Sequence, residues 1–220
     1  MEVYSTIVSF FQEGGLFMYP IVLVFALGLA IAVERYMFLT VTTTKNKVLW
    51  KKVTPYLRSG NFSAAAEVAG KSKAAVATIM TYGLNRVRSA SRREDVEKAM
   101  EESLMEVMPR LEKRTHYLAT FANIATLLGL LGTIIGLIRA FTAVSNANPA
   151  EKADLLSASI SVAMNTTAFG LMVAIPLLLI HTVLQTKTTE IVDSLEMASV
   201  KFLNAITERS APTKKPAAST

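Results

Sequence analysis

Three long stretches of the chain contain no charged residue, and they set its architecture. They cover residues 16–33, 117–138 and 155–186. The hydrocarbon layer of a bilayer is about 30 Å thick, and a helix that rises about 1.5 Å per residue needs roughly 20 apolar residues to cross it. We therefore expect an all-α membrane protein with three transmembrane helices.

Between the first two stretches, apolar residues recur at helical spacing instead of running continuously. The segments 50–57, 62–69 and 74–87 each carry one apolar face. Ser91, with a glutamate three residues later, matches a capping box. Pro109 should bend the helix that starts there, but no glycine or turn cluster interrupts it before the second apolar stretch. We predict one helix of about 50 residues that continues into the second span.

These patterns divide the chain into segments. We expect an interfacial amphipathic helix, three spans, a helical domain between the first two spans, a short link between the second and third, a further helix and a disordered tail. In chain order these are residues 1–15, 16–40, 41–115, 116–144, 145–154, 155–187, 188–209 and 210–220.

The distribution of basic residues predicts how the chain crosses the membrane. Residues 44–115 contain 15 Lys and Arg against 8 Asp and Glu, whereas no Lys or Arg precedes Leu16. Basic residues are enriched on the cytoplasmic side of membrane proteins. We therefore expect the N-terminus and the link at 145–154 on the periplasmic side. The helical segments 41–115 and 188–209 and the C-terminus are expected in the cytoplasm. Because topology explains the net charge of +6, no nucleic-acid partner is needed. The first stretch lacks a basic leader and a cleavage site, which indicates a retained anchor.

Small residues form a continuous face along the second stretch. In steps of three and four, this face contains Ala122, Thr126, Gly129, Thr133, Gly136 and Ala140. Gly132 adds a further small position, and Gly170 and Ala174 form a similar face on the third stretch, before a kink expected at Pro176. Such faces let helix backbones approach closely in lipid. Packing of this kind between copies can also build a ring.

Hydroxyl and amide side chains cluster at membrane depth. Thr126 and Thr133 share a face of the second stretch, and the third contains Asn165, Thr166 and Thr167. A threonine in a membrane helix commonly bonds the carbonyl four residues earlier and has no other role. Hydroxyls and amides can also order water or coordinate a small cation, so we expect these five residues, Thr126, Thr133, Asn165, Thr166 and Thr167, to line an ion path. They cannot themselves take up and release a proton near neutral pH. No Asp or Glu lies inside the three stretches, so proton conduction would need a carboxylate from another polypeptide.

Several functional classes lack support in the sequence. There is no phosphate-binding glycine loop and no nucleophile with a base, so we expect neither an enzyme nor a cofactor. The chain has no cysteine, which excludes disulfides and zinc–thiolate sites. His116 and His181 lie near the predicted cytoplasmic interface, where we interpret both as ordinary interfacial residues.

Two motifs resemble the paired signatures of a known family. LLGLLGTIIGLIRAF followed by ISVAMNTTAFGLMVAIP is similar to the glycine-rich helix and the Thr-Ala-x-Gly-Leu helix of the MotA/TolQ/ExbB channel family. The likeness extends to Gly14-Gly15, Glu34-Arg35 and the Gly60-Asn61-Phe62 turn. Three spans are typical of the ExbB and TolQ branch.

The resemblance implies an assembly and a mechanism. It implies a homopentamer in the bacterial inner membrane around a dimer of a single-span ExbD/TolR-like partner. The partner's membrane aspartate would meet Thr133 and Thr167, and flow of H⁺ or Na⁺ would move one part against the other. The resulting motor would drive work at the cell envelope, in contact with membrane lipids.

Two positions depart from the family pattern and bear on the ion. ExbB and TolQ usually have a glutamate at the position matching Val162 and a proline at that matching Thr126. The sequence lacks this glutamate and has two consecutive threonines, Thr166 and Thr167. Neutral oxygen ligands are therefore enriched in the third stretch. A sodium ion held by Thr133, Thr166 and Thr167 is therefore one alternative, and a proton carried by the partner's aspartate is the other.

Two other functional classes remain as rivals. A non-conducting scaffold would use the small-residue faces only for assembly, and it would tolerate loss of the hydroxyls at Thr133 and Thr167. A substrate transporter would be expected to contain an internal repeat or paired broken helices, and the sequence shows neither.

Overall fold

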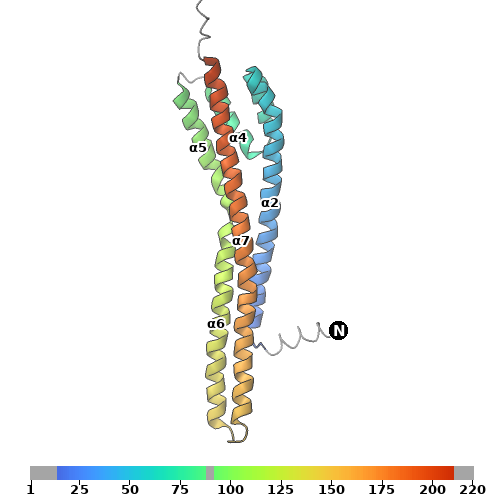
Figure 1. The fold of residues 1–220 in the computed structure, drawn as a ribbon, viewed down its shortest axis with the longest axis vertical. Coiled ribbons are helices and arrows are strands. Elements are labelled where there is room, and N and C mark those ends of the chain that lie inside the picture. Colours follow the sequence, from blue (N-terminus) through green and yellow to red (C-terminus); the bar gives the residue numbers. More distant parts are fainter. Residues whose placement is uncertain (1–13, 88–91, 211–220) are drawn as a thin grey trace, which may run out of the picture. The chain divides into compact units, whose positions relative to one another are not determined.

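The structure, a computed structural model, describes residues 14–87 and 92–210. Nearly all of the predicted interfacial helix at 1–15 and of the predicted tail at 210–220 lies outside this range. The described elements are all helices: α2 (Met18–Ser59), α3 (Phe62–Gly70), α4 (Ala75–Val87), α5 (Arg93–Glu112), α6 (Thr115–Asn146) and α7 (Lys152–Ser210) (Figure 1). Three helices are long and apolar enough to cross a membrane. The predicted all-α fold with three spans is confirmed.

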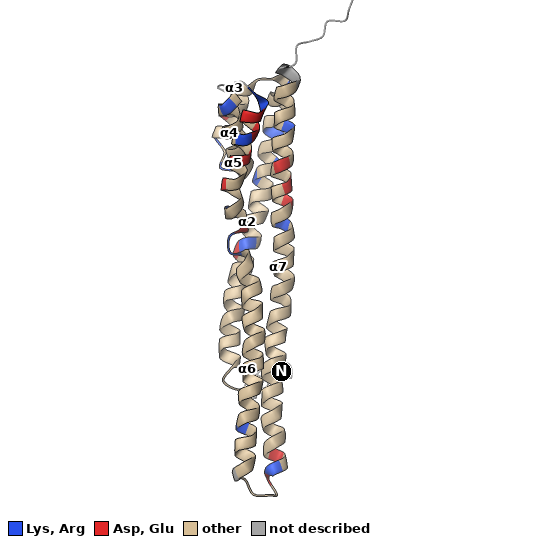
Figure 2. Ribbon diagram, turned by 90° about the vertical axis from the view of Figure 1, so that its left-hand side faces the viewer, with Lys and Arg blue, Asp and Glu red and all other residues tan. Residues whose placement is uncertain are grey.

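The chain divides into two compact units. Met1–Tyr36 and Arg114–Gln185 form one, here called the apolar unit, and Met37–Lys113 and Thr186–Thr220 form the other, the charged unit. Acidic and basic residues gather on α3, α4, α5 and the adjoining ends of α2 and α7, and the apolar unit is almost free of them (Figure 2). Each of α2 and α7 contributes to both units without a break.

In the apolar unit, α6, α7 and the first half of α2 lie side by side (Figure 1). Small residues allow the approach: a Cβ placed on Gly28 of α2 would lie 2.8 Å from a methyl carbon of Leu177 in α7. The outward side chains are large and apolar, and Leu130 and Leu179 are 52% and 64% exposed. Lipid would solvate such surfaces, as in membrane helices generally.

The charged unit has an aliphatic core to which α2, α4, α5 and α7 contribute. Its buried side chains include Leu49, Val53, Ile79, Met80, Val96, Met100, Leu195 and Phe202. The glycine of α4 permits close packing, because a Cβ on Gly83 would lie 2.8 Å from both Met100 Sδ and Phe202 Cε1. Burial of these residues on one stripe of each helix explains their 3.6-residue periodicity.

The prediction of one helix of about 50 residues that continues into the second span is confirmed in extent, since Arg93–Ser145 is one candidate span of 53 residues, but a short break interrupts the helix. Helix α5 ends at Glu112, and α6 begins at Thr115 after Arg114 adopts a left-handed conformation with φ of 67°. Pro109 lies in the last turn of α5, where it lacks the N–H needed for the helical hydrogen bond. Ser91 lies outside the described residues, and the N-cap position of α5 is held by Arg92, whose side chain makes no capping bond.

Arg114 also forms an ion pair at the polar end of the apolar unit. Its Nη1 lies 3.3 Å from Glu34 Oε2, and the two side chains are 50% and 44% exposed. Exposed pairs of this kind typically contribute about 0–1 kcal/mol. The pair therefore contributes little to the stability of the fold.

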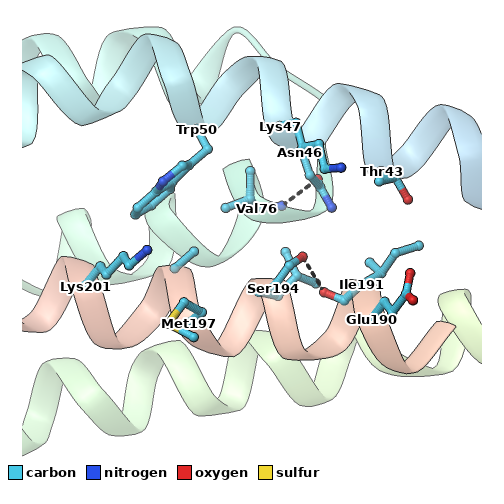
Figure 3. A pocket seen from close by; sticks show the side chains of 12 residues that line it. Thr43, Asn46, Lys47, Trp50, Val76, Glu190, Ile191, Ser194, Met197 and Lys201 are labelled. Carbon is cyan, nitrogen blue, oxygen red and sulfur yellow. Dashed lines mark hydrogen bonds between the residues drawn. The ribbon is translucent and has the colours of Figure 1, made fainter. Parts of the chain in front are cut away.

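A buried amide joins α2 to the start of α4 in the charged unit. The Oδ1 of Asn46 accepts a hydrogen bond of 3.2 Å from the backbone N–H of Val76 (Figure 3). Val76 lies in the first turn of α4, where backbone N–H groups have no partner inside the helix. Asn46, which is only 6% exposed, thus satisfies a donor that would otherwise be buried and unpaired.

Asn46→Ala is expected to destabilise the charged unit by about 1 kcal/mol. The unpaired N–H of Val76 would cost about 1–3 kcal/mol, and the loss of the buried Nδ2 of Asn46, which has no partner among the described residues, offsets part of it. Thermal unfolding in detergent, together with protease cleavage within α4, would measure it. Asn85→Ala is the matched control because Asn85 is an exposed residue of α4. Equal stability of the two variants would contradict the capping role of Asn46.

Candidate functional site

The second and third apolar helices cross at glycine. A Cβ on Gly170 of α7 would lie 2.7 Å from the carbonyl oxygen of Ala125 and 3.1 Å from the Cα of Gly129 in α6. A Cβ on Gly129 would in turn lie 3.2 Å from the Cα of Thr167. Part of the predicted small-residue face therefore packs within one chain, where it brings the backbones of α6 and α7 into contact.

Thr133 and Thr167 meet at this crossing, and their hydroxyls form a hydrogen bond with each other. The Thr133 hydroxyl also reaches Gly129 O in its own helix at 3.2 Å and Ala163 O in α7 at 3.3 Å. The Thr167 hydroxyl donates to Gly129 O in α6 at 3.0 Å. Each hydroxyl thus contacts a carbonyl of the opposite helix, which an isolated membrane threonine does not do.

Thr166 lies on a different side of α7 from this pair. It is buried, and its hydroxyl lies 2.6 Å from Gly14 O and 3.0 Å from Val162 O, so two carbonyl acceptors share its single proton. Its methyl group fills the space above Gly132, where a Cβ would collide with it. The structure therefore uses Thr166 to join α7 to the segment before α2, and it does not place the Thr166 hydroxyl beside the other two.

Thr126 and Asn165 also lie apart from the hydroxyl pair. Thr126 is exposed, and among the described residues its hydroxyl bonds only Ala122 O, four residues earlier, at 3.1 Å. Asn165 is half-buried, and its amide has no hydrogen-bond partner among the described residues. Consecutive helical residues point about 100° apart, which separates Asn165, Thr166 and Thr167 onto different faces.

The other residues predicted to pack helices together also lie on α6 and α7. A Cβ on Gly136 would lie 2.8 Å from the Cβ of Ala163, and Ala174 is 3% exposed. Pro176 lies inside α7, which stays helical through it, so the predicted kink remains a prediction.

The sequence reading missed a small cavity beside Thr166. It has a volume of about 120 Å³ and is lined by Gly14, Gly132, Arg139, Val162 and others. Arg139 directly follows the uncharged stretch, is exposed and makes no ion pair within the described part of the chain. The signal available in the sequence was the single positive charge beside a long apolar stretch.

Four neutral oxygen atoms therefore converge at the crossing of α6 and α7. They are the hydroxyls of Thr133 and Thr167 and the carbonyls of Gly129 and Ala163. Oxygen atoms of this kind coordinate hard cations and order water, but none of them titrates near neutral pH. Across the described residues, no group of three or more His, Cys, Asp or Glu is placed to hold a metal ion.

Comparison with known proteins agrees with these features. Residues 71–197 match the MotA/TolQ/ExbB proton channel family. The biopolymer transport protein ExbB homolog of Methanothermobacter thermautotrophicus is 28% identical to this chain over 196 residues. These residues cover 88% of this chain and 68% of that protein. The biopolymer transport protein ExbB-like 1 of Synechocystis is 31% identical, with 79% and 68% covered. The Tol-Pal system protein TolQ of Haemophilus influenzae is 31% identical, with 50% and 46% covered. The chain is thus a membrane protein that belongs to the MotA/TolQ/ExbB proton channel family.

Proposed function

We propose that this chain is the ion-conducting subunit of an ExbB/TolQ-like motor in the bacterial inner membrane. The observation that carries the proposal is the hydroxyl pair of Thr133 and Thr167 at the crossing of two apolar helices. Both hydroxyls are half-buried and reach carbonyls of the opposite helix, so they offer oxygen ligands at membrane depth. Ion flow would drive work at the cell envelope, such as TonB-dependent transport.

The proposal requires a second protein. The three apolar stretches contain no carboxylate, and hydroxyls alone cannot hold and release a proton. We assign that role to the membrane aspartate of a single-span ExbD/TolR-like partner, present as a dimer inside a homopentamer of this chain. Relatives named as biopolymer transport and Tol-Pal system proteins support this assignment.

The transported ion is H⁺ or Na⁺. Val162 stands where ExbB and TolQ usually have a glutamate, so a second titrating group is missing and neutral ligands are favoured. Thr126, which stands where they usually have a proline, lies apart from the hydroxyl pair. A sodium site would be built on Thr133, Thr167 and the carbonyl of Gly129, which lie together. Thr166 would not bind the ion directly, because its hydroxyl already donates to Gly14 O. It would instead help to hold α7 in place.

The membrane potential is the proposed energy source. We place the N-terminus outside and the basic segments in the cytoplasm, and a potential that is negative inside would draw cations inward through the motor. This supplies about 2.3 kcal/mol per elementary charge for each 100 mV. This energy is comparable to the free energy of a hydrogen bond to a charged group, and such bonds would break and form when the partner's carboxylate moves from one subunit to the next.

The test compares motor output of cells that express the chain and its partner, in sodium and sodium-free media at fixed membrane potential. Output that requires sodium identifies a sodium motor. Output without sodium that a protonophore abolishes identifies a proton motor. Output indifferent to both gradients would overturn the proposal and leave the non-conducting scaffold, whose hydroxyls only tie α6 to α7.

A further inference from the structure

Two grooves of opposite charge lie on different faces of α7 in the charged unit. The first, here called the basic groove because its two lysines outnumber its one glutamate, has a volume of about 310 Å³ and lies among α2, α4 and α7. It is lined by Lys47, Trp50, Glu190, Ser194, Met197 and Lys201, among others (Figure 3). The acidic groove, of about 240 Å³, lies between α5 and α7 and is lined by Glu97, Glu101, Leu104, Glu196, Val200 and Leu203, among others.

The spacing along α7 explains why the grooves are separate. Residues 190, 194, 197 and 201 recur in steps of three and four and share one face, whereas 196, 200 and 203 share another. The buried stripe that contains Leu195 and Phe202 packs against the core. One copy of the chain therefore presents the basic groove on one face of α7 and the acidic groove on another. The surfaces around these two grooves are called the basic edge and the acidic edge.

The three glutamates of the acidic groove and the two lysines of the basic groove make no ion pair among the described residues, although Glu190 lines the basic groove together with those lysines. Glu97, Glu101 and Glu196 make no ion pair with any described residue of their own chain. The same holds for Lys47 and Lys201 in the range that the structure describes. Glu97 and Glu101 are four residues apart on α5, a spacing at which like charges destabilise a helix.

The basic edge repeats this arrangement with the opposite sign. Lys47 and Lys51 are four residues apart on α2, and both are exposed. Each edge also exposes an apolar side chain of α7: Met197 is 57% exposed in the basic groove, and Val200 is 52% exposed in the acidic groove. Two edges with unpaired opposite charges and exposed apolar centres are complementary to each other.

We propose that the acidic edge of one copy docks into the basic groove of the next copy. Glu97 and Glu101 of α5 then face Lys47 and Lys201, and the apolar side chains of both edges are covered. Because the two surfaces differ, the contact is head-to-tail, and its repetition closes a ring when the rotation permits. This rests on the proposed ring-forming motor and names the surfaces that assemble its cytoplasmic part.

The absence of cysteine makes a cross-linking test direct. The full chain carrying Lys201→Cys and Glu101→Cys is oxidised in membranes and resolved by mass. We expect a ladder of covalent oligomers, since a disulfide requires Cα atoms within about 7 Å. Lys201→Cys with Glu102→Cys is the matched control, because Glu102 is the next residue of α5 and does not line the acidic groove. A ladder that is absent, or equal in both variants, overturns the proposal.

Charge reversal provides the second measurement. Lys47→Glu with Lys201→Glu should weaken assembly at least about tenfold, because it opposes like charges across the interface. Adding Glu97→Lys and Glu101→Lys to the same chain should restore it, which a misfolded variant could not do. Lys52→Glu controls for the loss of a positive charge from α2. Failure of the reversed chain to reassemble counts against the proposal.

The outcomes separate this interface from the proposed function. Specific cross-links without ion-dependent output would keep the interface and remove the motor. Ion-dependent output without cross-links or charge rescue would support the proposed motor and contradict the proposed interface. In that case both grooves would be available to bind the single-span partner.

Discussion

Thr167→Val is expected to reduce ion-driven output about 10- to 100-fold while the protein remains folded and assembled. Valine has nearly the shape of threonine, so the crossing of α6 and α7 stays filled. The variant removes a hydroxyl that bonds both Thr133 and Gly129 O. A polar contact to a charged group contributes roughly 1.5–3 kcal/mol, which corresponds to one to two orders of magnitude in rate.

Two further variants make this prediction specific. Thr167→Ser retains the hydroxyl and should recover most of the output. Thr126→Val is the matched control, because Thr126 is exposed and its hydroxyl, in the part of the chain that the structure describes, bonds only the carbonyl of its own turn. Ion flux into vesicles that contain the chain and its partner provides the measurement. Equal flux from the Thr167→Val and wild-type proteins would show that the hydroxyl pair is structural.

The fold could be predicted because its main cause is local composition. Each of the three uncharged stretches lies almost entirely within one long helix, α2, α6 or α7. A stretch of this length and apolarity has few stable alternatives to a membrane helix, since every backbone polar group must be satisfied internally. The three-span all-α architecture therefore required no knowledge of long-range contacts.

The break between α5 and α6 could not be predicted in the same way. Helix ends are usually marked by glycine or asparagine, which adopt the left-handed conformation readily. Here that conformation is adopted by Arg114, with φ of 67°. Pro109 signalled a disturbance one turn earlier but not the place where the helix ends. The boundary between the two units coincides with this break and depends on tertiary packing.

The candidate site was only partly accessible from sequence. Thr133 and Thr167 could be selected by residue type and depth, but their contact depends on the register between α6 and α7. That register is fixed by the close approach of Gly129 and Gly170, which no local pattern reveals. In contrast, helix geometry alone could have separated Thr166 from Thr167, because neighbours on a helix point in different directions.

Gly170→Ala is expected to lower the melting temperature by roughly 2–12 °C and to reduce ion-driven output. The new Cβ would lie 2.7 Å from the carbonyl oxygen of Ala125 and 3.1 Å from the Cα of Gly129, and both are backbone atoms. Because no side chain can move aside, α6 and α7 must separate. Overpacking typically costs about 1–3 kcal/mol, and each kcal/mol shifts the melting temperature of a protein of this size by about 2–4 °C.

A graded glycine series tests whether backbone contact is the cause. Gly28→Ala should be milder, because its Cβ meets the methyl carbons of Leu177, which can change rotamer. Gly70→Ala should be neutral or stabilising, since nothing lies within 4 Å of its Cβ. Thermal unfolding of all three in the same detergent gives the ranking, and a Gly170→Ala protein no less stable than Gly70→Ala would contradict it. Because the same separation pulls Thr133 from Thr167, ion flux should fall most in the Gly170 variant, which links the packing of the crossing to its proposed ion ligands.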